Sequence, residues 1–301
     1  WCPFFEFWNG GDWIAADRLM GKFPDSFTRY QCRINDCVSN KLTPDHLGPL
    51  SLGFAHRPTF ALMCNPHNSG KNNRLTLFDI TKLRKHQEEE VVTSWQNHAI
   101  WKILNPRVVD EETANRLSKI LRDNQRIAMS IIVQISNGGG NAFLSTLLGL
   151  HYANFDVEFI NLRAVDGVTV FDQLEKSPRD SKQVEKQMLR RLRIAFNALS
   201  DYSDKDNRHG WTVEDTWTNE VNRIIDLLAE KEDTKLKSIS NTITSYVDGK
   251  TTEINSLTEE IVSLTTSPPE HFQVAFGMLM QVLTNIAISL EMNWDSDRYV
   301  R

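Results

Sequence analysis

The sequence predicts an α+β fold, in which a small β-rich N-terminal domain of residues 1–90 joins a mostly α-helical body of residues 91–301. Short apolar runs broken by turn residues are typical of strands and prevail in the first part. Apolar residues spaced by three and four, which indicate amphipathic helices, prevail in the second. The first part also holds all four cysteines and is nearly neutral, whereas the second carries the negative balance of a chain with net charge −5. These shifts place the domain boundary near residues 85–91.

In the N-terminal domain we expect strands at residues 50–54, 59–63 and 75–78, with loops at 65–66 and 68–73. These segments combine apolar and β-branched residues with flanking Gly, Pro and Asn. Tryptophan and cysteine are also concentrated in this part of the chain. The pattern is that of a small sheet with long connections.

In the helical body, apolar residues repeat at helical spacing after residues 110, 188 and 217. The first of these helices begins with Asp110-Glu111-Glu112, where negative charge favours the helix dipole. Residues 157–171 are the exception, because they are rich in β-branched residues and contain the turn sequence Asp166-Gly167. We therefore expect one β-hairpin near 157–171.

The C-terminal segment 272–290 contains no charged residue and follows Pro268-Pro269, a sequence that favours the start of a helix. Its composition predicts a buried C-terminal helix at the centre of the body. Nineteen uncharged residues are also close to the ~20 that span the hydrocarbon core of a bilayer. Insertion into a membrane is therefore an alternative for this segment.

A second uncharged segment, residues 127–150, is interrupted by Gly138, Gly139 and Gly140. The simplest interpretation is two buried helices joined by a glycine turn. In a βαβ arrangement the same glycines would form an anion-binding loop, although the sequence lacks a P-loop or dinucleotide-binding pattern. A third interpretation is a membrane-inserting hairpin that acts together with residues 272–290.

Apolar residues between 236 and 264 follow one another at steps of three and four, as in a coiled-coil seam. Gly249 interrupts the repeat, so one long helix and two antiparallel helices both fit. The seam either packs inside the chain or binds a partner or a second copy of the chain. Its residues are Leu236, Ile239, Ile243, Ile254, Leu257, Ile261 and Leu264.

Four residues of the N-terminal domain have the side chains and the approximate spacing of a tetrahedral zinc site: Cys32, Cys37, Cys64 and His67. One pair is separated by two residues and the other by four. Disulfides that include Cys2 and buried free thiols are the two alternatives. Zinc is thus the one cofactor that the sequence indicates.

Basic residues at helical spacing form one face of a predicted helix: Lys182, Lys186, Arg190 and Arg193. Such a face is either solvated or meets an acidic or phosphate-bearing partner. Because the sequence pI is about 5.9, we do not expect a nucleic-acid partner.

No serine-hydrolase, zinc-protease or kinase motif occurs in the sequence. The function that the sequence favours is therefore a non-catalytic interaction or assembly protein, which uses helical surfaces to bind a protein partner or itself. A membrane-inserting protein and a metal- or nucleotide-binding enzyme are the alternatives. We expect a cytoplasmic localisation, while a processed secreted protein also fits the sequence.

Overall fold

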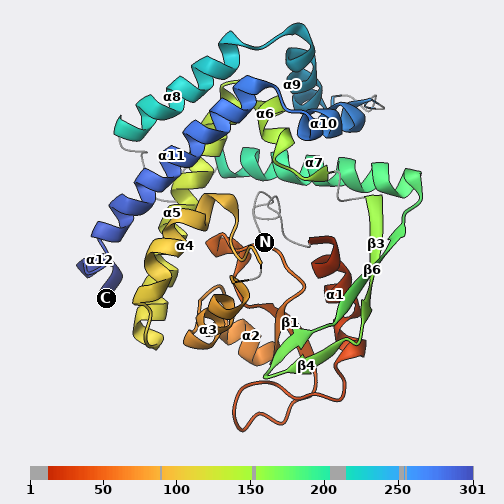
Figure 1. The fold of residues 1–301 in the computed structure, drawn as a ribbon, viewed down its shortest axis with the longest axis vertical. Coiled ribbons are helices and arrows are strands. Elements are labelled where there is room, and N and C mark those ends of the chain that lie inside the picture. Colours follow the sequence, from red (N-terminus) through yellow and green to blue (C-terminus); the bar gives the residue numbers. More distant parts are fainter. Residues whose placement is uncertain are drawn as a thin grey trace.

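The computed structural model describes residues 13–88, 90–150, 154–203, 215–250, 254 and 256–300. Helices predominate in this part of the chain, and short antiparallel strands form two small sheets. The predicted α+β class is therefore confirmed. In Figure 1, the strands and the first three helices lie at one end of the molecule, and α8, α9 and α10 lie at the other.

The N-terminal part begins with helix α1 and continues with a hairpin, two helices and short 3-10 turns. Its principal elements are α1 (Trp13–Ser26), β1 (Leu42–His46), β2 (Phe60–Cys64), α2 (Asn65–Lys71) and α3 (Leu77–His86). The strand expected at 59–63 is present as β2. The strands expected at 50–54 and 75–78 are wrong, because the former is a 3-10 helix over Leu50–Leu52 and the latter leads into α3.

Local capping explains why α2 and α3 are helices. Thr76 and Asp79 form a capping box at the start of α3, in which each side chain accepts from the other's backbone N–H. Cys64 is the N-cap of α2, and Pro66 occupies its first turn, where a missing N–H costs little. The loops expected over residues 65–73 are therefore mostly a short helix.

The larger sheet has the strand order β1-β2-β5-β4, and the smaller one pairs β3 with β6. The four later strands are β3 (Phe155–Ile160), β4 (Arg163–Val165), β5 (Val168–Val170) and β6 (Gln173–Pro178). Asp166 and Gly167, both with positive φ, connect β4 to β5. Ala61 of β2 pairs with Val168 of β5, so the larger sheet contains strands from both sides of residue 90.

The helical part contains α4 (His98–Leu104), α5 (Glu111–Asn137), α6 (Asn141–Thr146), α7 (Ser181–Ser203), α8 (Asp215–Glu230), α9 (Thr234–Val247), α10 (Leu257–Thr266), α11 (Glu270–Met292) and α12 (Asp297–Val300). Residues 127–150 contain the end of α5, a glycine turn and α6, which is the arrangement of two buried helices. Gly249, with φ +69°, follows α9, so the apolar seam is divided between two helices.

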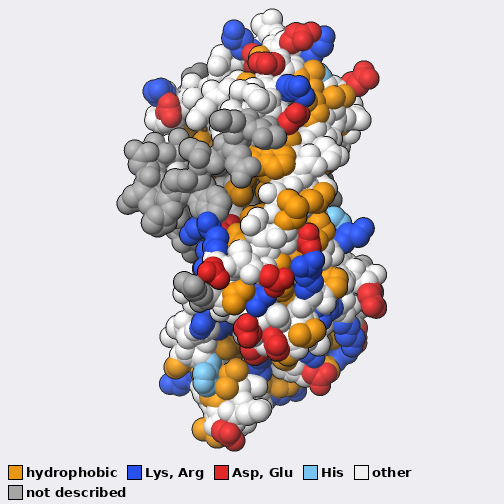
Figure 2. Space-filling view, turned by 90° about the vertical axis from the view of Figure 1, so that its left-hand side faces the viewer, with side chains coloured by type: hydrophobic (Ala, Val, Ile, Leu, Met, Phe, Trp, Pro, Cys, Tyr) orange, Lys and Arg blue, Asp and Glu red, His pale blue; other side chains and the backbone are white. Residues whose placement is uncertain are grey.

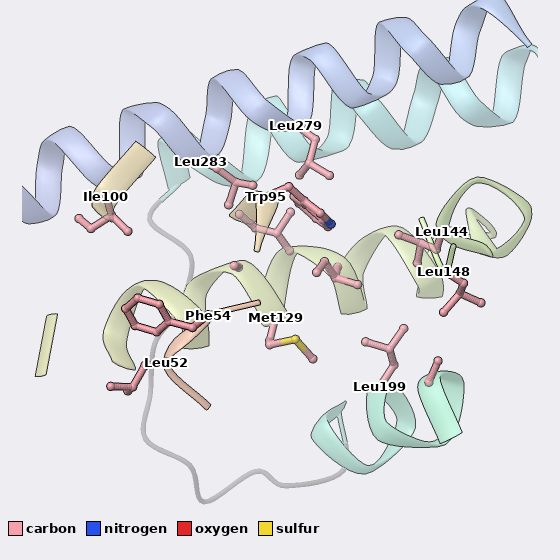
Figure 3. Packing of buried hydrophobic residues seen from close by; sticks show 14 of the residues in the cluster. Leu52, Phe54, Trp95, Ile100, Met129, Leu144, Leu148, Leu199, Leu279 and Leu283 are labelled. Carbon is pink, nitrogen blue, oxygen red and sulfur yellow. The ribbon is translucent and has the colours of Figure 1, made fainter. Parts of the chain in front are cut away.

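Helices α5 and α11 meet in the main hydrophobic core. Figure 3 shows Leu279 and Leu283 of α11 directed toward Trp95, with Met129 of α5 below them. Trp95 also meets Phe276 edge to face, with ring centroids 5.9 Å apart. In the described part of the chain, α11 is the one helix with the length and hydropathy of a membrane span. It packs against α4, α5 and α8, and its outer face remains exposed at Val274 and Ile288.

Gly140→Ala should destabilise the fold by about 1–3 kcal/mol, because an added methyl group must displace packed atoms. A Cβ at this position would lie 2.6 Å from a side-chain methyl of Ile135 and 2.9 Å from its carbonyl oxygen. Gly277→Ala is the matched control: it lies on the exposed side of α11 with open space around it, and should stabilise by about 0.5–1 kcal/mol. Urea unfolding measures both changes, and equal effects would contradict the packing argument.

Candidate metal centre and adjoining catalytic site

Cys32, Cys37, Cys64 and His67 come together at one end of the β1–β2 hairpin. Their ligand atoms all lie within 4.8 Å of one another. The His67 Nδ1 atom is 3.2 Å from Cys64 Sγ and 3.4 Å from Cys32 Sγ, and the sulfurs of Cys37 and Cys64 are 3.8 Å apart. All three cysteines are free thiols, while Cys2 lies outside the described residues. The four side chains form a site that could hold a metal ion.

Two local structures supply these ligands. Cys32 and Cys37 flank a tight turn that contains Asp36 at φ +63°, and the N–H of Cys37 donates to the carbonyl of Ile34. This turn is attached to the sheet because the N–H of Arg33 donates to Leu62 of β2. Cys64 and His67 stand where β2 passes into α2, three residues apart and therefore on one side of the first turn.

Backbone donors stabilise the thiolate form of Cys32. Burial raises the pKa of this thiol. Hydrogen bonds from the N–H groups of Cys64 and Ile34 and from His67 lower it by more, so that the pKa falls to about 7. The N–H of Cys64 lies 3.3 Å from the Cys32 sulfur. A thiolate is the form that binds metals, so these donors prepare the site for a cation.

A second polar cluster lies on the same strand–strand–helix unit. Strand β1 ends with Asp45 and His46, and α2 carries Asn68 and Lys71. Lys71 Nζ is 2.6 Å from an Asp45 carboxylate oxygen and donates to the backbone carbonyl of His46 at 3.2 Å. The amide nitrogen of Asn68 donates to the Thr43 hydroxyl at 3.1 Å and to the Pro44 carbonyl at 3.4 Å. The short helix thus lies directly against the end of β1.

Buried charges tie this cluster to α3. Lys71 also pairs with Asp79 at 3.0 Å, and Arg33 approaches Asp79 at 3.9 Å while stacking on the ring of Phe78. Asp79 is fully buried. Burial raises the pKa of Asp45, against the opposing effect of Lys71. The carboxylates and cations therefore hold one another in place within a region of low solvent access.

His46 is the nitrogen base of the cluster. Its Nε2 atom is 2.9 Å from Nδ1 of His56, and the Nε2 atom of His56 is 3.0 Å from a carboxylate oxygen of Asp17. Burial is the main effect that holds the pKa of His46 well below its usual value, and the positive charge of Lys71 adds to it. A neutral imidazole is the form that accepts a proton, so His46 is suited to general-base chemistry at neutral pH.

The remaining residues singled out from the sequence lie elsewhere. All seven seam residues, Leu236, Ile239, Ile243, Ile254, Leu257, Ile261 and Leu264, are buried in the main core by contacts within the chain. The four basic residues Lys182, Lys186, Arg190 and Arg193 are exposed along α7.

The glycine turn serves packing between α5 and α6. The N–H groups of Gly138, Gly139 and Gly140 donate to carbonyl groups of α5 at 2.9–3.0 Å. A Cβ on Gly138 would lie 2.6 Å from Ile225, so this residue allows close approach of α8. The turn borders a cavity of about 470 Å³, which is lined by both polar and apolar side chains of α5, α6, α7 and α9.

A neutral imidazole and a carboxylate at the end of one strand, with an amide on the helix packed against that strand, are side chains typical of metal-dependent hydrolases. A comparison with known families agrees with this class: the family described as Type II restriction endonuclease (RE_Alw26IDE) matches residues 3–291. The match covers nearly the whole chain, so the chain belongs to this Type II restriction endonuclease family. Searches of curated proteins and of solved structures gave no match.

Membership of this family corrects three predictions. The chain is a nuclease family member and not a non-catalytic assembly protein, and the membrane-inserting alternative is wrong as well. The prediction of no nucleic-acid partner is wrong because net charge describes the whole surface and not a local DNA-binding site. The alternative of a metal- or nucleotide-binding enzyme agrees with the family better than the assembly-protein prediction does. The expected cytoplasmic localisation is also consistent with the family.

The site residues predicted from the sequence did not include Asp45, His46, Asn68 or Lys71. The available signal was their position relative to the predicted metal ligands. Asp45-His46 lies between the two ligand pairs, and Asn68 directly follows His67. Because metal ligands bring distant segments together, polar residues beside them were candidates for the same site.

Asp79→Asn should lower the free energy of unfolding by about 2–3 kcal/mol, because Lys71 and Arg33 would then remain buried with less negative charge. Asp166→Asn is the control: it removes an exposed ion pair with Lys82 and should change stability by less than ~0.5 kcal/mol. Chemical denaturation of both variants tests this expectation. Equal stability of the two would show that the buried cluster does not need this charge.

Proposed function

We propose that this chain hydrolyses phosphodiester bonds of DNA at the β1–β2–α2 unit, with His46 as the general base. The observation that carries the proposal is the placement of Asp45 and His46 at the end of β1 and of Asn68 on α2, the helix packed against that strand. The family supports the substrate, since its members are restriction endonucleases.

The side chains beside His46 suit a magnesium ion. Mg²⁺ prefers oxygen ligands and is usually held by one or two carboxylates together with substrate phosphate. Asp45 supplies a carboxylate from β1, and Asn68 supplies an amide oxygen from α2, which packs against that strand. We therefore assign Asp45 and Asn68 as the residues that hold the ion. Once bound, it would polarise the phosphate and stabilise the departing oxygen.

The protein side chains have separate tasks in the reaction. His46 removes a proton from water, the water oxygen forms a bond to phosphorus, and the bond between phosphorus and one sugar oxygen breaks. The departing oxygen receives a proton from solvent. Lys71, placed between Asp45 and Asp79, keeps the Asp45 carboxylate oriented through its 2.6 Å contact.

The basic face of α7 is our candidate for contacts with DNA phosphates. Lys182, Lys186, Arg190 and Arg193 are exposed there, and their spacing spreads positive charge along the helix. The face of the molecule in Figure 2 carries acidic and basic side chains interleaved, without one continuous basic field. Binding to DNA therefore depends on local groups of positive charge, as expected for a chain with a net charge of −5.

We assign zinc to the Cys32, Cys37, Cys64 and His67 site, as a structural ion distinct from the catalytic one. Sulfur ligands ~2.3 Å from a tetrahedral zinc lie about 3.8 Å apart, which is the separation of the Cys37 and Cys64 sulfurs. Four protein ligands leave no open position for substrate. Cys64 and His67 lie at the start of α2, the helix that carries Asn68. A bound zinc ion would therefore fix the position of Asn68 relative to β1.

His46→Ala should reduce the rate of DNA cleavage in Mg²⁺ by about 10²–10⁴-fold, because the general base is lost. Single-turnover cleavage of plasmid DNA measures this rate. His98→Ala is the matched control, since His98 is an exposed histidine at the start of α4. Wild-type cleavage by His46→Ala would contradict the proposal.

The protein purified without chelator should contain one zinc ion per chain, and Cys64→Ser should lose it. Elemental analysis measures the content, with Cys2→Ser as the control that retains the ion. Removing zinc that is present at ~1,000 times its dissociation constant should cost about 4 kcal/mol of stability. A wild-type protein without zinc would refute this assignment and leave the cleavage test unaffected.

A further inference from the structure

His46 is the first member of a chain of three hydrogen-bonded side chains. Its Nε2 atom lies 2.9 Å from Nδ1 of His56, whose own Nε2 atom lies 3.0 Å from a carboxylate oxygen of Asp17. Asp17 belongs to α1, and His56 lies in the connection between β1 and β2. These hydrogen bonds link helix α1 to the proposed catalytic base through His56, whose exposed fraction is 2%.

The direction of these hydrogen bonds follows from the chemistry of the end group. An ionised carboxylate only accepts, so Nε2 of His56 carries the proton and donates to Asp17. Nδ1 of a neutral His56 is then an acceptor, which requires Nε2 of His46 to carry a proton and donate. The lone pair of His46 consequently resides on Nδ1.

We propose that Asp17 and His56 are positioning residues that fix His46 as its Nε2–H tautomer, so that Nδ1 is the atom that takes the proton from water. This inference rests on the proposed function of His46. It assigns to α1 and to the β1–β2 connection a role in the reaction, although neither residue touches the DNA phosphate.

The surroundings keep this chain of contacts in place. The backbone next to His56 is anchored because the N–H of Ala55 donates to Val92 at 2.9 Å. The His46 ring also packs edge to face on Phe60, with centroids 5.0 Å apart. Burial of His56 strengthens its hydrogen bonds relative to water, whereas the Asp17 side chain at the end of the chain of contacts is 60% exposed. When Nδ1 of His46 takes the proton, the imidazolium still donates to His56, and the negative charge of Asp17 favours it.

The test compares cleavage with DNA binding in variants of the purified protein. His56→Ala should reduce the single-turnover rate on plasmid DNA about 10–100-fold, and leave the affinity for the same DNA, measured with Ca²⁺ in place of Mg²⁺, within about twofold. His56→Asn should recover most of the rate, because its amide oxygen can accept the His46 Nε2–H at the position of Nδ1. Failure of His56→Asn to exceed His56→Ala would overturn the tautomer assignment.

Asp17 provides the second arm of the test. Asp17→Ala should slow cleavage about tenfold, and the double variant with His56→Ala should be no slower than His56→Ala alone, because both residues act through one chain. Asp25→Ala, an exposed aspartate on the same helix, should cleave like wild type. Additive losses would overturn the proposal.

If His46→Ala is inactive while His56→Ala cleaves normally, only this inference fails, whereas an active His46→Ala refutes the proposed function itself.

Discussion

The junction between β2 and α2 is the constraint on which the rest of the site depends. At Cys64 a buried strand ends, a helix begins and a metal ligand is presented, all within one residue. The helix that starts there places His67 toward the metal centre and Asn68 and Lys71 toward the end of β1. A shift of one residue at this junction would rotate each of these side chains by about 100° around the helix. The metal centre and the catalytic cluster therefore share a single geometric origin.

The catalytic cluster also depends on charges that are balanced away from water. Lys71 lies between two carboxylates, and Arg33 approaches the second of them. Such an arrangement is costly to assemble but strongly specifies its geometry, since any unpaired member would be buried alone.

The sequence allowed the fold class and the grouping of Cys32, Cys37, Cys64 and His67 to be predicted, because both leave local signals. Helical spacing marks α5, α7 and α11, and cysteine is rare enough for its spacing to be noticed. The residues of the proposed catalytic site left no such signal. The contacts of His46 come from residues that are not adjacent in sequence: its ring meets His56, which in turn meets Asp17. Short elements such as α2 were missed because seven residues contain too few helical repeats to establish a period.

The placement of β5 beside β2 has a consequence for the order in which the protein matures. The hydroxyl of Thr169 bonds both the N–H of Phe60 and the carbonyl of Pro58, and the N–H of Leu62 donates to Gly167. On the ribosome, β2 therefore remains an open edge until residues more than 100 positions later have emerged. The nuclease unit is completed late in translation, and the nascent chain must keep an apolar strand from pairing with other chains until then.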